Sequence, residues 1–253
     1  MSGLRTGADR RQERARKARG RFGARAVLLL VALFFVAVPF TVLALLVRSS
    51  WGPLRELDQG AADRLHTWAL GSPASIDVMK LITDVGGPGP MRALGVLVAV
   101  VLLLRRSYRL AAFVLTTLAL AAVLSYSLKA AVGRTRPVFD EAIVNAPGGS
   151  FPSGHAMTSM VVTALLLLVV LPHVPRGHWG WAVAVGAALV LAVGFTRIAL
   201  GAHFISDVLG GWVIGGACVM AVTGAFQAWR REAPDRDQDD EIALDEGAVT
   251  PQS

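Results

Sequence analysis

The sequence predicts an all-α integral membrane protein, a bundle of six transmembrane helices with a surface amphipathic helical segment between the first two. Hydrophobic residues make up 54% of the 253 residues and charged residues only 17%, and the mean hydropathy is +0.54. Soluble domains carry about a quarter charged residues. Six long apolar runs and a basic stretch before the first of them complete the pattern. This combination excludes a cytosolic globular protein and a disordered chain.

Six apolar runs lie between charged residues or Gly and Pro breaks. They cover residues 26–47, 85–104, 110–132, 155–171, 179–198 and 206–229. A bilayer core about 30 Å thick is crossed by about 20 helical residues, so each run is a candidate span. The first run is too long for the apolar part of a secretory signal and no small-x-small cleavage pattern follows it. We therefore expect an uncleaved membrane anchor.

The basic residues predict the orientation of the bundle. Nine of the 25 Lys and Arg lie in the first 25 residues, directly before the first run. The positive-inside rule places this end in the cytoplasm, and six crossings return the turns 105–109 and 172–178 and the C-terminus to that side. These segments carry Arg105, Arg106, Arg109, Arg176, Arg230 and Arg231. The chain is thus expected to be a multi-pass cell-membrane protein with both termini cytoplasmic, and its net charge of +7 does not indicate nucleic acid.

Three regions are expected along the chain. Residues 1–25 form a basic cytoplasmic tail, residues 26–229 form the six-span domain, and residues 230–253 form an acidic tail. Eight of the 18 acidic residues lie beyond Arg231, and this tail has no aromatic residue, so we expect it to be disordered and cytoplasmic.

The segment 48–84 is long and amphipathic. It carries apolar residues at helical spacing, namely Leu54, Leu57, Ala61, Leu65 and Trp68, with Glu56, Asp58, Asp63 and Arg64 between them. This pattern is typical of a helix on the outer membrane surface. A connector packed over the bundle explains it equally well.

Small residues in the last run indicate close helix contacts. Gly211 and Gly215 form a G-x-x-x-G pair, which can mark a dimer interface. Any six-helix bundle also needs small residues at its contacts, so we favour packing within the bundle and leave the oligomeric state open. The single cysteine, Cys218, excludes an internal disulfide and a cysteine-rich metal site.

Five ionisable residues cluster at the outer ends of three runs. Lys129 and Arg136 close the third run, Arg197 closes the fifth, and His203 and Asp207 open the sixth. Charged groups at membrane depth are costly and usually functional. Each cation alone could be an interface anchor whose long side chain reaches the headgroups. Together, five such groups at one depth predict a site on the extracytoplasmic face.

Two histidines lie among these groups. His203 and Asp207 are four residues apart, so on a helix the carboxylate could fix the imidazole tautomer and raise its basicity, as a nucleophile needs. A pair that merely holds the helix end is the less favoured alternative. Ser153 is a candidate N-cap at the start of the fourth run, Gly154 allows a ligand close to the backbone, and the helix N-terminus favours an anion. His155 places a titratable group beside this anion site.

These residues fit phosphoryl transfer. Lys129, Arg136 and Arg197 can neutralise the three equatorial oxygens of a phosphoryl group, so no metal and no other cofactor is expected. One histidine can attack phosphorus while the other protonates the leaving oxygen. An anion transporter is the alternative from another class. It is disfavoured because transporters hold such groups near the bilayer midplane.

The residues resemble a known signature in three blocks. The blocks are Lys129, six residues, Arg136-Pro137; Pro152-Ser153-Gly154-His155; and Arg197, five residues, His203, three residues, Asp207. Their order and spacing are similar to those of the type 2 phosphatidic acid phosphatase (PAP2) superfamily, in its integral membrane lipid phosphatase branch. Thr196 stands where the family usually has serine and keeps the hydroxyl.

The resemblance implies a membrane phosphatase that removes phosphate from a lipid of the bilayer through a phosphohistidine. It implies that His203 is the nucleophile, Asp207 its orienting partner and His155 the general acid. The residues implied to bind phosphate are Lys129, Arg136, Ser153, Gly154 and Arg197. Phosphatidic acid, phosphatidylglycerol phosphate and undecaprenyl diphosphate are among the substrates of the family. A phosphotransferase with the same pocket is the alternative.

Overall fold

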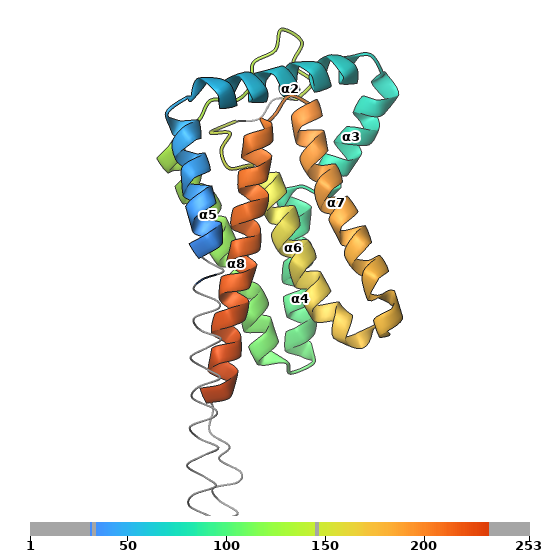
Figure 1. Ribbon diagram of the computed structural model, residues 1–253. Helices are drawn as coiled ribbons and strands as arrows, with labels where there is room; N and C mark the ends of the chain where they lie inside the picture. Colours follow the sequence, from blue (N-terminus) through green and yellow to red (C-terminus); the bar gives the residue numbers. More distant parts are fainter. Residues whose placement is uncertain (1–30, 32–33, 145–146, 233–253) are drawn as a thin grey trace, which may run out of the picture.

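The computed structural model describes residues 31, 34–144 and 147–232, and every regular element in these ranges is helical. The longer helices are Phe34–Arg48, α2 (Gly52–Leu70), α3 (Pro73–Val85), α4 (Pro88–Leu104), α5 (Tyr108–Val132), α6 (Gly154–Val170), α7 (Trp179–Ala199) and α8 (Ile205–Glu232). Two short 3-10 turns, Leu171–His173 and Arg176–His178, join α6 to α7. The predicted all-α fold is confirmed (Figure 1).

Within the described residues, five stretches are long and apolar enough to cross a membrane. They are Pro73–Leu104, Tyr108–Val132, Gly154–His173, Arg176–Ala199 and Ile205–Phe226. The described part of the first predicted span is the helix Phe34–Arg48, which meets α2 at 84°. Large apolar side chains cover the outside of the bundle, for example Leu104 at 80% and Trp181 at 75% exposure. Such a surface suits lipid and not water, and the chain is a multi-pass membrane protein.

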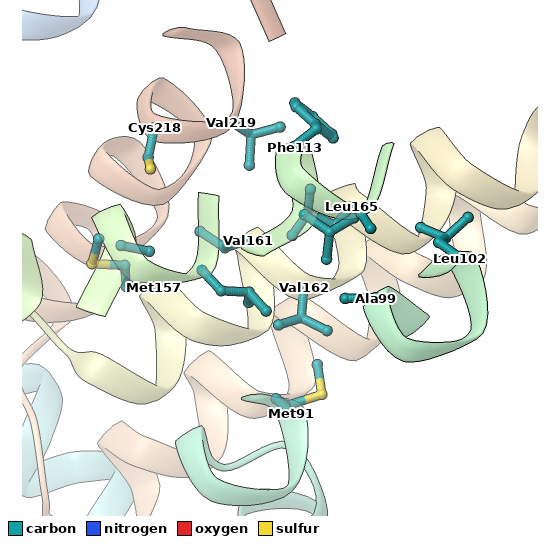
Figure 2. Packing of buried hydrophobic residues seen from close by; sticks show 14 residues of the cluster. Met91, Ala99, Leu102, Phe113, Met157, Val161, Val162, Leu165, Cys218 and Val219 are labelled. Carbon is teal, nitrogen blue, oxygen red and sulfur yellow. The ribbon is translucent and has the colours of Figure 1, made fainter. Parts of the chain in front are cut away.

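The apolar core lies between α4, α5, α6 and α8. Figure 2 shows Met157, Val161 and Val162 of α6 packed among side chains of the other three helices. Gly211 and Gly215 bring α8 close to α6, because a Cβ on Gly211 would lie 2.7 Å from the Ser153 carbonyl oxygen. Packing within the bundle therefore explains the G-x-x-x-G pair.

The second span begins earlier than residue 85, where the sequence placed it. Helix α3 already packs on α7, with Met79 buried against Ala199 and Leu200, and α4 continues the same span after a break. The break contains Gly86, at which a Cβ would collide with the Val193 side chain of α7. Glycine is therefore needed for the two helices to approach.

Helix α2 lies across one end of the bundle, over the end of α7 and the start of α8 (Figure 1). The segment 48–84 thus contains two helices, and the first of them covers the bundle. Its packed face was not the one expected from the apolar spacing: the buried residues are Asp58, Ala62, His66 and Ala69. Leu57 and Trp68 are more than half exposed.

Successive spans run in opposite directions, so the connections alternate between the two ends. The turn after α4, the 3-10 turns after α6 and the end of α8 lie at the end opposite α2 (Figure 1). These are the connections in which the sequence placed Arg105, Arg106, Arg109 and Arg176. The predicted tail 1–25 and residues 233–253 of the predicted tail 230–253 lie outside the described residues. Residues 230–232, predicted to belong to the disordered tail, form the end of α8.

Candidate active site

All the site residues expected from the sequence lie at the end of the bundle covered by α2. Lys129 is in the last turn of α5, and Arg136 follows in the loop between α5 and α6. Ser153 caps α6, whose first turn carries Gly154 and His155. Arg197 is in the last turn of α7, His203 in the turn after it, and Asp207 in the first turn of α8.

The structure brings these residues together around His155. The charges of Lys129, Arg136, Arg197 and His203 are all close enough to act on the His155 imidazole. The break between α3 and α4 forms another side of the site, because a Cβ on Gly87 would lie 3.4 Å from His155 Nε2. Five spans, the loop between α5 and α6 and the turn between α7 and α8 therefore contribute to one polar site.

His203 is 1% exposed, and its two ring nitrogens face groups of opposite charge. Nδ1 lies 3.4 Å from Asp207 Oδ2 and makes no hydrogen bond with a described group, whereas Nε2 lies 3.1 Å from Arg136 Nη1. A guanidinium can only donate, so Nε2 must accept and the proton must be on Nδ1. Burial lowers the pKa of His203 to about 4, with Asp207 opposing and Arg136 and Arg197 adding to the effect. A neutral imidazole with its lone pair on Nε2 results.

Asp207 reaches His203 differently from the sequence prediction. Helix α8 begins at Ile205, so His203 precedes the helix and does not share a helical face with Asp207. Asp207 Oδ2 accepts a hydrogen bond from the Phe204 amide at 2.9 Å, as the acidic residue of a capping box does. This bond holds the carboxylate on the side of the turn where Nδ1 lies.

Arg136 and Lys129 are held in the site by backbone oxygens. Arg136 donates to the carbonyl oxygens of four residues, and Lys129 Nζ donates to one of them at 2.9 Å. The four are Pro147, Gly148, Gly149 and Ala202, and the one shared with Lys129 is Gly149. Burial lowers the pKa of Arg136 below its ordinary value, with Asp207 opposing. Carbonyl dipoles orient the two cations but leave their charge available.

Arg197 is 5% exposed and only partly hydrogen-bonded. One terminal nitrogen donates to Thr83 Oγ1 on α3 at 3.1 Å, whereas its buried Nε has no partner among the described groups. None of Lys129, Arg136 and Arg197 forms an ion pair with a carboxylate in the described part of the chain. Buried charges are normally paired. Three converging cations that no described carboxylate pairs with directly could therefore bind an anion.

The N-terminus of α6 faces the same space. The Ser153 side chain accepts from the Ala156 amide at 3.4 Å and so caps the helix, as expected. A Cβ on Gly154 would lie 3.9 Å from Lys129 Cε, which shows how closely the backbone approaches the cation. The Thr196 hydroxyl donates to Val193 within α7 and does not contribute to the anion site in this structure.

A second layer of the site was missed from the sequence. Arg134 bridges two buried carboxylates, at 2.8 Å from Asp207 Oδ1 and 2.7 Å from Asp58 Oδ2. Asp58 also accepts from the Ser206 amide and hydroxyl. Because Asp58 is on α2, this network ties the covering helix to the carboxylate that faces His203. In the sequence, the one indication of this network was Arg134, a second arginine two residues before Arg136.

These features define the class: a multi-pass helical membrane protein with a cluster of buried cations and a neutral histidine at one end of the bundle. Within that class, the sequence model described as the PAP2 superfamily matches residues 110–231. This stretch is just under half of the chain and contains all three blocks of the signature.

Two curated relatives align with about two fifths of the chain. Phosphatidylglycerophosphatase B of Bacillus subtilis (strain 168) is 32% identical over 111 residues, which are 43% of this chain and 54% of the relative. Lipid A 1-phosphatase of Rhizobium etli is 34% identical over 114 residues, 42% of this chain and 45% of the relative. The chain thus spans about half the length of these relatives.

The fold is similar over a longer stretch to a solved structure. The crystal structure of a transmembrane PAP2-type phosphatidylglycerolphosphate phosphatase from Bacillus subtilis superposes with a TM-score of 0.69 and 25% sequence identity. The match covers 81% of this chain and 97% of that one. It therefore extends well beyond residues 110–231 in this chain.

Proposed function

We propose that the protein is a metal-independent membrane phosphatase that hydrolyses a lipid phosphate or diphosphate through a phosphohistidine. The observation that carries this proposal is the set of three converging cations, none of them ion-paired with a described carboxylate, around the Nε2 lone pair of His203. The match of residues 110–231 to the PAP2 superfamily and the phosphatase names of both relatives support it.

In the first step, the phosphate of the lipid replaces His203 as an acceptor for Arg136, which frees the Nε2 lone pair. Nε2 attacks phosphorus, the bond to the lipid oxygen breaks, and His155 gives a proton to the departing alcohol. The Nδ1–H group faces Asp207, whose negative charge stabilises the positive charge that develops on the ring. Lys129, Arg136 and Arg197 bind the equatorial oxygens, together with Ser153 and the Gly154 backbone amide.

In the second step, water replaces the lipid alcohol. His155, now neutral, takes a proton from the water as its oxygen attacks phosphorus, and the bond from phosphorus to Nε2 breaks. Inorganic phosphate leaves and both histidines return to their starting states. The cations supply the charge stabilisation that Mg²⁺ supplies in many other phosphoryl-transfer sites.

Phosphatidylglycerol phosphate is the substrate that the similarities favour, since one curated relative and the solved structure are named for it. Phosphatidic acid and undecaprenyl diphosphate remain comparison substrates. The decisive assay measures phosphate release by detergent-purified protein from each of the three lipids, with and without excess EDTA. We expect activity that EDTA leaves unchanged and vanadate inhibits. Loss of activity with EDTA that Mg²⁺ restores would contradict the role given to the cations.

The same assay distinguishes hydrolysis from phosphoryl transfer to another acceptor. A hydrolase incorporates one oxygen of ¹⁸O-labelled water into each phosphate released, whatever alcohol is present. A phosphotransferase forms a new phosphate ester when glycerol or another alcohol is added and releases correspondingly less phosphate.

The active site is proposed to face the extracytoplasmic side, because the arginine-containing turns lie at the opposite end. A cysteine introduced at Ala142, in the exposed loop before α6, should react with an impermeant thiol reagent added to intact cells. A cysteine at Ser107, in the exposed turn after α4, should not react. Cys218 is buried and can stay in place. The opposite labelling pattern would place the active site in the cytoplasm.

A further inference from the structure

A cavity of about 550 Å³ opens beside the proposed active site and is not used by the mechanism above. It lies between the end of the helix Phe34–Arg48, the start of α2, and the end of α5 with the loop that follows. Its lining combines four arginines, Arg48, Arg55, Arg134 and Arg136, with apolar side chains that include Val47, Leu54 and Phe204.

The four arginines differ in how far their charge is already used. Arg134 is neutralised by Asp58 and Asp207 and stacks on the Phe204 ring at 4.2 Å. Arg48 makes one hydrogen bond, which Nη1 donates to the Ala131 carbonyl oxygen at 2.8 Å. The Arg55 side chain has no hydrogen-bond or ion-pair partner within the described part of the chain. Arg48 and Arg55 therefore leave the cavity with positive charge to bind an anion.

Arg136 connects this cavity to the active site. Arg136 lines the cavity, and its Nη1 lies 3.1 Å from Nε2 of His203. An anion bound by Arg48 and Arg55 would thus lie in a cavity that shares Arg136 with the phosphate site at His203. The apolar wall can accept the carbon atoms of the same molecule.

We infer that this cavity is a second phosphate subsite, in which Arg48 and Arg55 bind the inner phosphodiester of a lipid whose terminal phosphomonoester lies at His203. The inference rests on the proposed function and specifies its substrate class. Two phosphates on opposite sides of Arg136 need a linker of a few atoms, as glycerol provides. The two phosphates of a diphosphate share one bridging oxygen and would both lie on the His203 side. The subsite therefore selects a lipid with two separated phosphates over a lipid with one.

The test is a competition between two lipids with the same acyl chains in one detergent micelle. Phosphatidylglycerol phosphate supplies both phosphates, and phosphatidic acid supplies only the monoester. The double variant Arg48→Gln and Arg55→Gln should lower the ratio of kcat/KM for the two-phosphate lipid to that for phosphatidic acid by about tenfold or more, because two charge-assisted contacts are lost. Continued hydrolysis of a soluble aryl phosphate shows that the double variant is folded.

Arg64→Gln is the matched control, since Arg64 is exposed on α2, as Arg55 is, but does not line the cavity. It should leave the ratio unchanged. An unchanged ratio in the double variant would overturn the subsite. If kcat/KM falls equally for both lipids, the arginines only attract anionic surfaces, and if neither value falls, the arginines do not contact the substrate. Failure of the wild-type protein to hydrolyse either lipid would instead refute the proposed function.

Discussion

The two ends of α6 and α8 show opposite ways of stabilising a buried residue. At the end near α2, these helices begin with His155 and Asp207, and the surrounding contacts are hydrogen bonds and charges. Further along, Val161 and Val219 lie in an apolar core that involves packing alone (Figure 2). The change from one environment to the other takes less than two helical turns on α6.

The difference indicates where function and stability lie. A polar network in a low-dielectric site is stable only when nearly every group is paired, so unpaired groups there point to a ligand. An apolar core has no such requirement and contributes through buried area. Changes at the site end should therefore alter chemistry first, and changes in the core should alter stability first.

The largest effect is expected for His203→Asn, which removes the attacking nitrogen but keeps a polar side chain of similar size. Hydrolysis of alkyl and aryl phosphates alike should fall by at least about 10⁴-fold, because the nucleophile is needed whatever the leaving group. Steady-state assays with both substrates measure this loss. Gel-filtration profiles should match those of the wild type. A His203→Asn protein that retains substantial turnover would show that the site end has another nucleophile.

A smaller effect is expected for Asp58→Asn. Asp58 acts through Arg134 on Asp207 and does not reach the phosphate site, so it is a positioning residue. We expect kcat to fall by about 10- to 100-fold with little change in KM, because the phosphate-binding cations are untouched. Asp58→Glu should restore part of kcat. A change confined to thermal stability, with kcat intact, would mean that the network only holds α2 in place.

The pH dependence of stability offers a third comparison. Burial holds the pKa of His203 at about 4, below the ordinary value of 6.5, so the unfolded chain takes up this proton first as pH falls. The contribution of neutral His203 to the free energy of unfolding is fully present above pH 6.5. It decreases by about 3 kcal/mol as the pH falls to 4. Unfolding midpoints should fall less over this range in His203→Asn than in the wild type. His178→Asn, in an exposed turn, should keep the wild-type slope.

The smallest effect on activity is expected in the core. Val161 is 1% exposed, and Val161→Ala removes two methyl groups at a position where α6 faces the other helices. Stability should fall by about 2 kcal/mol, with kcat/KM within about twofold of the wild type. Denaturation and kinetics on the same preparation check this. A core variant that is stable but inactive would remove the distinction between the two regions.

Much of the fold could be predicted because long apolar runs determine membrane helices. The predicted spans 110–132, 155–171 and 179–198 agree closely with α5, α6 and α7. Helix α3 was not recognised as part of a span because Asp77, Lys80 and Asp84 lower its hydropathy.

The residues of the candidate site were found through spacing within three short blocks. The structure brings all of them together, including His203, although it lies before α8 rather than on it. Asp58 was read as part of a solvated face because its partners are far away in the sequence. Arg134 is 76 residues further along and Ser206 is 148 residues further along. No local pattern encodes such contacts.

The central claim is that His203 forms a covalent bond to phosphorus while His155 only transfers protons. The most direct measurement is rapid acid-free quenching of His155→Asn during turnover of a ³²P-labelled activated aryl phosphate, followed by peptide mapping. An aryl leaving group does not need protonation, and loss of His155 slows the attack of water, so the intermediate should accumulate. We predict acid-labile label on the peptide containing His203, and none when His203→Asn is added. Label on another residue, or turnover without any labelled protein, would contradict the account.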